Sequence, residues 1–218
     1  MTQETYQKAV FIKSAAELSQ LPQDTGLEVA FAGRSNAGKS TLLNLITRQK
    51  GLAKTSKTPG RTRLINIFEF APNKRLIDLP GYGFAEVPKS VRENWQRTLG
   101  LYLQQRMCLR GLVILMDCRH PLKELDCQLI TWACESKLDI HLALTKSDKL
   151  THSEKIKILK LVKAELAADP VYNSHSIDVQ FISATEPPGK SGLDLLEKKL
   201  NSWFSGPKEI ISEIISPV

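Results

Sequence analysis

One short segment, residues 33–40, strongly restricts how this chain can fold; it reads Gly-Arg-Ser-Asn-Ala-Gly-Lys-Ser. It matches the phosphate-loop pattern G-x-x-x-x-G-K-[ST], in which successive backbone N–H groups wrap a polyphosphate. Glycine allows the backbone angles that this wrapping needs, and the helix that opens after the loop adds N–H donors and partial positive charge. Lys39 would reach the β- and γ-phosphates, and the Ser40 hydroxyl would ligate Mg²⁺.

The flanking residues supply the context that the pattern requires, a strand before the loop and a helix after it. Residues 27–32 are short and mostly apolar, as in a buried strand, and apolar residues recur at helical spacing over residues 42–46. This context favours a nucleotide site over the alternative, a glycine-rich turn that joins two elements.

The remaining chain alternates between strand-like and helical patterns. Five further strands are expected, at residues 64–70, 75–77, 112–116, 140–144 and 179–182. Alternating strands and helices predict a three-layer α/β fold with a mostly parallel six-stranded sheet and helices on both faces. The phosphate loop makes this a fold of the phosphate-loop NTPase type. Ligands of such sheets bind at the carboxyl ends of the strands, and every candidate functional segment of this chain lies there.

The length of 218 residues suits a single domain. Residues 1–26 are expected to be a lead-in that packs on the domain edge, with a helix-like stretch at 14–18, and residues 205–218 a C-terminal tail. Trp95 is expected in the core. The sequence has no apolar run long enough for a membrane span, no signal-peptide pattern and no C-x-x-C pair among its four cysteines. These features predict a cytoplasmic protein without a membrane span, and we expect a monomer.

The positive charge of the chain is concentrated in one region. Residues 29–68 contain no Asp or Glu but eight Lys and Arg residues, which exceeds the whole net charge of +7. Such a segment either meets the backbone of a nucleic acid or is simply a solvated basic loop.

A second segment, Asp78-Leu79-Pro80-Gly81, follows an apolar strand. A carboxylate at this place can hold Mg²⁺, and the N–H of Gly81 could sense the γ-phosphate. The alternative is a turn aspartate ahead of Pro-Gly. Within the basic loop, Thr62 is our choice of further Mg²⁺ ligand because it stands just before a strand.

Residues 145–148, Thr-Lys-Ser-Asp, indicate which base is bound. The carboxylate of Asp148 can accept hydrogen bonds from N1–H and the exocyclic amine of guanine, whereas adenine has an acceptor at N1. The stem of Lys146 could cover the base. Asp148 could instead cap a helix, but Thr151 and Glu154 already form a capping box there. Ser183-Ala184 could offer a backbone N–H to the guanine oxygen.

In their order these motifs resemble those of translation-factor-like GTPases of the TrmE-Era-EngA-EngB class, and this resemblance implies a small G-domain. Residues 31–36, 59–62 and 81–83 closely resemble the EngB family, also called YihA or YsxC, and the likeness covers nearly the whole chain. The resemblance implies a bacterial GTPase that binds GTP and GDP and acts in assembly of the large ribosomal subunit, through that subunit or its rRNA and protein precursors, with a link to cell division and septation.

The motifs and the resemblance together give a candidate site. The catalytic candidates are Lys39, Thr62 and Gly81, and the metal ligands Ser40, Thr62 and Asp78. The GTP-binding candidates are Gly33, Arg34, Ser35, Asn36, Ala37, Gly38, Lys39, Ser40, Gly60, Arg61, Thr62, Arg63, Leu64, Asp78, Leu79, Pro80, Gly81, Thr145, Lys146, Ser147, Asp148, Ile182, Ser183 and Ala184.

Two residues qualify the expected chemistry. Tyr82 stands where some GTPases carry a water-orienting Gln, so intrinsic hydrolysis is expected to be slow without a ribosomal partner. Asn36 resembles the loop Asn of GTPases that coordinate K⁺ beside the phosphates, or it merely stabilises the loop. The alternative functions are a phosphate-loop kinase acting on a small molecule, for which no acceptor site or lid is evident, and an RNA-binding module whose nucleotide only sets its shape.

Overall fold

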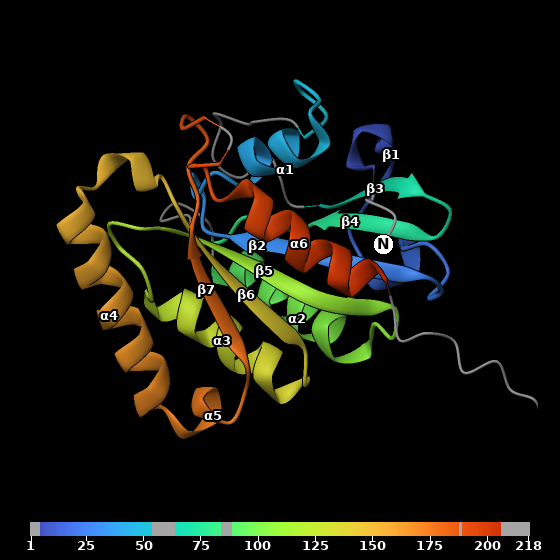
Figure 1. Ribbon diagram of the computed structural model, residues 1–218. Coiled ribbons are helices and arrows are strands. Elements are labelled where there is room, and N and C mark those ends of the chain that lie inside the picture. Colours follow the sequence, from blue (N-terminus) through green and yellow to red (C-terminus); the bar gives the residue numbers. More distant parts are fainter. Residues whose placement is uncertain (1–4, 54–63, 84–88, 188, 206–218) are drawn as a thin grey trace, which may run out of the picture.

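The computed structural model describes residues 5–53, 64–83, 89–187 and 189–205, and these residues form a three-layer α/β fold (Figure 1). Its strands make one sheet in the order β1-β3-β4-β2-β5-β6-β7. Strands β2, β4, β5, β6 and β7 run parallel to their neighbours among themselves, whereas β3 is antiparallel to both β1 and β4. The predicted fold class is therefore confirmed.

The elements have these bounds. The strands are β1 Val10–Ala15, β2 Leu27–Gly33, β3 Ile65–Ala71, β4 Lys74–Asp78, β5 Leu109–Asp117, β6 Asp139–Thr145 and β7 Ile177–Phe181. The α-helices are α1 Lys39–Thr47, α2 Lys89–Gln105, α3 Glu124–Glu135, α4 His152–Ala168, α5 Pro170–Asn173 and α6 Leu193–Phe204, and short 3₁₀ turns cover Tyr6–Lys8, Leu18–Gln20 and Ser147–Lys149.

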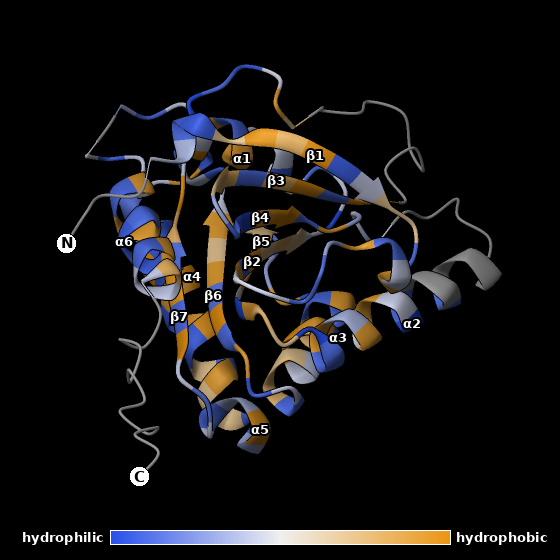
Figure 2. Cartoon of the chain, turned by 90° about the vertical axis from the view of Figure 1, so that its right-hand side faces the viewer, coloured by the Kyte–Doolittle hydropathy of each residue, from blue (hydrophilic) through white to orange (hydrophobic). Residues whose placement is uncertain are grey.

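Two apolar layers bury the two faces of the sheet. Helices α1 and α6 pack with Val29, Phe31 and Leu115 on one face, whereas α2 and α3 pack with the alternate residues of the same strands on the other. Figure 2 shows α6 on one side of the sheet and α2 and α3 on the opposite side. Strands β5 and β6 are almost entirely buried, as parallel strands covered on both faces must be.

The N-terminal lead-in differs from the expectation. Residues 10–15 form strand β1, which pairs antiparallel with β3 at the edge of the sheet, so the sheet has seven strands in the described part of the chain and not six. The helix-like reading of residues 14–18 was wrong, because Ser14 and Ala15 pair with Asn66 and Ile65. Long-range pairing of a β-branched and aromatic segment outweighed local helical propensity there.

A buried ionic cluster holds the amino-terminal ends of the strands, away from the candidate site. Glu28 accepts hydrogen bonds from Arg75 at 2.9 Å and from Arg106 at 2.7 Å, and the hydroxyl of Tyr102 donates to it at 3.2 Å. Glu28 is 1% exposed, yet these donors, Arg106 foremost, outweigh burial and lower the pKa of its carboxyl. The cluster ties β2, β4 and α2 together.

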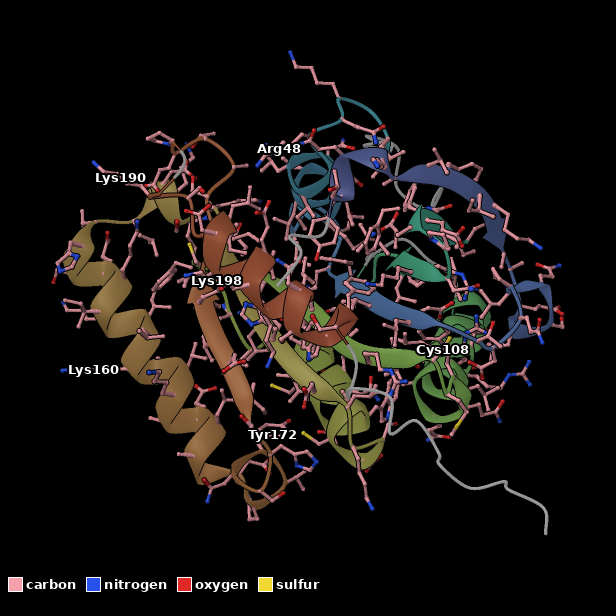
Figure 3. The ribbon with its side chains drawn as sticks, turned by 45° about the vertical axis from the view of Figure 1, so that its right-hand side comes forward. Arg48, Cys108, Lys160, Tyr172, Lys190 and Lys198 are labelled. Atoms are coloured by element: carbon pink, nitrogen blue, oxygen red, sulfur yellow. The ribbon has the colours of Figure 1, made fainter. Side chains whose placement is uncertain are left out.

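Close packing fixes α6 and α5. A Cβ at Gly111 would lie 2.4 Å from the Trp203 ring, so only glycine lets α6 approach β5 this closely. The Trp203 indole N–H donates to Asp139 at 2.9 Å. The hydroxyl of Tyr172, labelled in Figure 3, donates to the carbonyl of Cys127 at 3.0 Å and so joins α5 to α3.

Cys108, Cys118 and Cys134 are buried and Cys127 is half-buried; all four are free thiols. The side chain of Trp95 lies outside the described residues. No helix in the described part of the chain has the length and apolar character of a membrane span.

Candidate nucleotide-binding site

The phosphate loop joins β2 to α1, and its two glycines are needed for different reasons. Gly38 has a φ of +92°, in the left-handed region that glycine enters without strain. A Cβ at Gly33 would instead lie 2.9 Å from the carbonyl oxygen of Leu115, so Gly33 allows the close approach of β5. Asn36 also has a positive φ, of 64°. The loop thus has the turning backbone that a phosphate cradle needs.

Lys39 and Asp78 meet at the centre of this region. The Lys39 ammonium pairs with Asp78 Oδ1, and the two side chains are 9% and 3% exposed. Asp78 reaches this place because β4 runs parallel to β2, with Asp78 opposite Phe31. The structure therefore brings together the phosphate-loop lysine and the carboxylate of the Asp-x-x-Gly segment.

Asn66 is a neighbour of Asp78 that the sequence analysis missed. Its side-chain amide donates to Asp78 Oδ2 at 3.1 Å, and it accepts a hydrogen bond from Ser14 at 2.7 Å. The antiparallel register of β3 and β4 places Asn66 directly opposite Asp78. The available signal was an amide inside a largely apolar strand.

The residues near Asp78 offer oxygen ligands that suit Mg²⁺. Ser40 follows Lys39 in the first turn of α1, and Asp78 carries the carboxylate. Mg²⁺ is usually held by one or two carboxylates together with substrate phosphates and waters, and this donor set fits that arrangement. Among the described residues no group of three or more His, Cys, Asp or Glu side chains could hold a metal ion.

The segment after Asp78 is fastened to the phosphate loop through its backbone. The N–H of Leu79 donates to the carbonyl of Phe31 at 3.0 Å. Tyr82 donates its N–H to the Gly33 carbonyl at 3.3 Å and accepts from the N–H of Ser35 at 2.8 Å. Leu79 and Pro80 are buried and Gly81 is half-buried, so Gly81 is held beside the loop.

Asp148 and Ser183 lie together at the end of the sheet where a base would bind. Asp148 Oδ1 accepts from the Ser183 hydroxyl at 3.0 Å, and Oδ2 pairs with Lys149 at 3.0 Å. The hydrogen bond from Lys149, supported by that from Ser183, lowers the pKa of Asp148. The carboxylate is therefore charged at neutral pH, as an acceptor for two N–H groups must be.

Backbone hydrogen bonds around the Ser183-Ala184 pair involve Ile182 and Ser183. The N–H of Ser147 donates to the carbonyl of Ile182 at 3.2 Å, which aligns the two loops. The N–H of Ser183 donates to the carbonyl of Ser191 at 2.9 Å. Of the two backbone N–H groups of Ser183 and Ala184, that of Ser183 is therefore already bonded within the protein.

Lys146 has a partner that the sequence analysis did not name. Its ammonium lies 3.0 Å from Asp117 Oδ2, and Arg119 contacts the same carboxylate at 2.6 Å. These contacts, the hydrogen bond from Arg119 foremost, hold the pKa of Asp117 well below its usual range. Asp117 ends β5, and an aspartate at the carboxyl end of an apolar strand was the signal that pointed to it.

Thr145 connects the two halves of the site. Its hydroxyl donates to the carbonyl of Ala37 in the phosphate loop at 2.7 Å and lies 3.1 Å from the carbonyl of Met116. Thr145 is only 5% exposed, so this bond is shielded from water. Residues 145–148 and the phosphate loop are thereby fixed relative to each other.

Not every predicted residue lies in the described part of the chain. Gly60, Arg61, Thr62 and Arg63 fall outside it, and Leu64 is exposed just before β3. Arg34 extends along the backbone of Gly83, where an added Cβ would lie 3.0 Å from its Nε.

The fold, the phosphate loop and the Asp-x-x-Gly segment define a protein of the phosphate-loop GTPase class. A sequence model of the family described as "50S ribosome-binding GTPase" matches residues 28–146. The chain is 52% identical to the probable GTP-binding protein EngB of Enterobacter sp. (strain 638) over 206 residues, 94% of this chain and 96% of that protein. It is 55% identical to the EngB protein of Mannheimia succiniciproducens over 200 residues, 92% of this chain and 94% of that protein.

The chain belongs to the EngB family of GTP-binding proteins. A crystal structure of a probable GTP-binding protein EngB superposes with a TM-score of 0.63 at 22% identity, covering 83% of this chain and all of that one, 100%. The predicted family is confirmed, and GTP hydrolysis is supported by membership of a GTPase family.

The bond between Thr145 and Ala37 yields the first prediction. Replacing Thr145 by Val keeps the side-chain shape but leaves the Ala37 carbonyl without this donor. We expect the affinities for GTP and GDP to fall together by about tenfold, measured by titration calorimetry. Thr145→Ser retains the hydroxyl and should restore most of the binding.

The matched control is Thr131→Val, because the Thr131 hydroxyl donates to the Cys127 carbonyl at 3.1 Å within α3, away from the site. Its nucleotide affinities should equal those of the unmodified protein. Unchanged affinities in Thr145→Val would contradict the connecting role of Thr145.

Proposed function

We propose that this chain is a GTPase that hydrolyses GTP to GDP and phosphate slowly on its own and serves as a nucleotide-dependent switch in assembly of the bacterial large ribosomal subunit. The observation that carries the proposal is the juxtaposition, at one edge of the sheet, of the Lys39–Asp78 pair and the Asp148–Ser183 pair. The family description names a ribosome-binding GTPase. A link to cell division and septation, a cytoplasmic location, a single-domain organisation and a monomeric state belong to the same proposal.

The proposed roles of the individual residues combine the arrangement of the described residues with the sequence-based choice of Thr62. The ammonium of Lys39 would turn from Asp78 to the β- and γ-phosphates. Ser40, Asp78 and Thr62 would hold Mg²⁺, which would supply positive charge beside the phosphates. The N–H of Gly81 contacts the γ-phosphate, and the backbone of residues 33–38 wraps the polyphosphate. Among these residues, Lys39, Thr62 and Gly81 are the proposed catalytic groups.

K⁺ binding beside Asn36 stays a prediction. The left-handed backbone of Asn36 is a conformation that Asn adopts more readily than most residues, which supports the loop-stabilising role.

Membership of the GTP-binding family favours a GTPase over the alternative function, a phosphate-loop kinase acting on a small molecule.

The proposed base site predicts a change of specificity in Asp148→Asn. An amide cannot accept both N–H groups of guanine, but its NH₂ can donate to the second carbonyl oxygen of xanthine. We expect GTP affinity to fall by more than about a hundredfold and XTP binding to appear, measured by competition for a fluorescent nucleotide.

The control for this variant is Asp194→Asn, which removes an exposed carboxylate in the first turn of α6. It should bind GTP normally and ignore XTP. If Asp148→Asn kept its preference for GTP, Asp148 would not be the residue that reads the base.

The ribosomal role rests in part on charge. Arg48 and Lys50 of the basic region are exposed, whereas Lys39 is paired with Asp78. Lys160 and Lys190 are exposed as well, and Figure 3 labels both at the surface. The four other cations of residues 29–68 that follow Lys50 lie outside the described part of the chain. Exposed cations suit contacts with RNA phosphates.

The hydrolysis rate gives a third prediction. Tyr82 is 3% exposed and cannot position water as a glutamine amide does. The purified protein should turn over GTP far more slowly than about 1 s⁻¹, and bacterial large ribosomal subunits should accelerate it. An activating partner is worth about 10⁵-fold in Ras, or about 7 kcal/mol, which marks the upper range of the effect.

Phosphate release with large subunits, with small subunits and with neither measures this effect. High salt should remove the stimulation if phosphate contacts carry the binding. Turnover near 1 s⁻¹ in the absence of any partner would contradict the switch mechanism.

A further inference from the structure

Tyr82, the residue after the proposed γ-phosphate sensor, is an internal side chain. The ring is buried at 3% exposure, and its hydroxyl donates to Asp126 Oδ1 at 2.7 Å. Asp126 lies in the first turn of α3 and is 0% exposed. A polar pair placed this deep is favourable only while the hydrogen bond is made.

Asp126 is itself anchored. Its Oδ2 accepts from the backbone N–H of Lys123 at 3.0 Å, which caps the start of α3. Both carboxylate oxygens thus have a donor, one from α3 and one from Tyr82. The side chain of Tyr82 is therefore tied to a rigid helix terminus.

The backbone of Tyr82 is tied to the phosphate loop. Its N–H and carbonyl bond to Gly33 and Ser35, on either side of Arg34, and it forms a parallel bridge with Arg34. Tyr82 consequently joins the phosphate loop, through its backbone, to α3, through its hydroxyl. Gly81 precedes Tyr82 directly, and on its other side the N–H of Leu79 donates to the carbonyl of Phe31 at 3.0 Å.

Burial and the nearby charges keep the Tyr82 phenol protonated, so that it can donate a hydrogen bond. Burial raises the pKa of Tyr82 well above its usual value, with the nearby charge of Asp126 adding to the shift. Burial also raises the pKa of Asp126. The hydrogen bond from Tyr82 and the positive charge of Arg34 partly offset this rise. The phenol remains protonated throughout the neutral range and is available to donate.

We infer that Tyr82 and Asp126 are positioning residues that fix the N–H of Gly81 at the phosphate loop and thereby set the preference for a nucleotide with a γ-phosphate. The inference rests on the proposed function of the site. Without the hydrogen bond, the Gly81 segment gains conformational freedom that it loses again when it contacts a γ-phosphate. GDP has no γ-phosphate and does not incur this cost.

The test is Tyr82→Phe in the full chain, with calorimetric affinities for GDP and for a non-hydrolysable GTP analogue. The ratio of analogue affinity to GDP affinity should fall by about tenfold relative to the unmodified protein. GDP affinity itself should change little. A thermal melt verifies that the variant is folded.

Tyr102→Phe is a matched control, because the Tyr102 hydroxyl also donates to a buried carboxylate, Glu28, at 3.2 Å but at the far end of the sheet. Tyr102 is 0% exposed. Loss of the Tyr102 hydroxyl should lower the stability of the protein without changing the ratio of analogue affinity to GDP affinity. This result would separate a positioning role of Tyr82 from general stabilisation.

Asp126→Ala supplies a second route to the same result if Tyr82→Phe does not fold. It should lower the ratio by a similar factor, and the double variant should lower it no further, because both changes remove the same bond. An unchanged ratio, or an equal loss for both nucleotides, would overturn the inference and leave the proposed function standing. Failure of the unmodified protein to bind either nucleotide would overturn both.

Discussion

The ion pair between Lys39 and Asp78 is the interaction on which the candidate site depends. An ammonium and a carboxylate buried side by side are tolerated because each neutralises the other, and removing one partner of such a pair typically costs about 3–5 kcal/mol. A ligand that separates them must therefore bring replacement charges for both. A polyphosphate can take the place of Asp78 beside Lys39, and a divalent cation can take the place of Lys39 beside Asp78. By the same balance of charge, a triphosphate and Mg²⁺ would suit this site as a pair.

The parallel sheet brings the Lys39–Asp78 pair and the candidate base site to the same end of the strands. Asp78 stands opposite Phe31 because β4 and β2 run in the same direction, and Thr145 ends β6 at the same edge. The hydroxyl of Thr145 then reaches the carbonyl of Ala37 across the intervening strand β5. The proposed phosphate and base sites thus lie at the same end of the sheet, while the ionic cluster around Glu28 stabilises the opposite ends of the strands.

Much of this arrangement could be predicted from short stretches of sequence. The roles of residues 33–40 and 145–148 could be predicted from the local sequence alone, because a phosphate loop and a base-reading carboxylate need fixed residue types at fixed spacing. The alternating elements predicted the three-layer fold, and the motifs at residues 31–36, 59–62 and 81–83 predicted the family. The roles of the individual residues stay predictions that nucleotide-binding measurements will test. Thr62 lies outside the described residues.

What could not be predicted depends on pairing between distant segments. Strand β1 looked partly helical because its partner β3 lies about fifty residues away in the chain. Asn66 and Asp126 gained their roles from a strand register and a side-chain contact that no local pattern specifies. Gly33 looked like a residue chosen for its backbone angles, yet the structure shows that the approach of β5 requires it.

The central claim is that a backbone cradle and one ammonium hold a triphosphate while a separate carboxylate selects guanine. Titration calorimetry of the unmodified protein with GTP, GDP and ATP in the presence of Mg²⁺ tests it most directly. The account predicts that GTP and GDP bind more than about a hundredfold tighter than ATP, because adenine leaves Asp148 without its N–H donors. Equal affinity for ATP, or no binding of the guanine nucleotides, would contradict it.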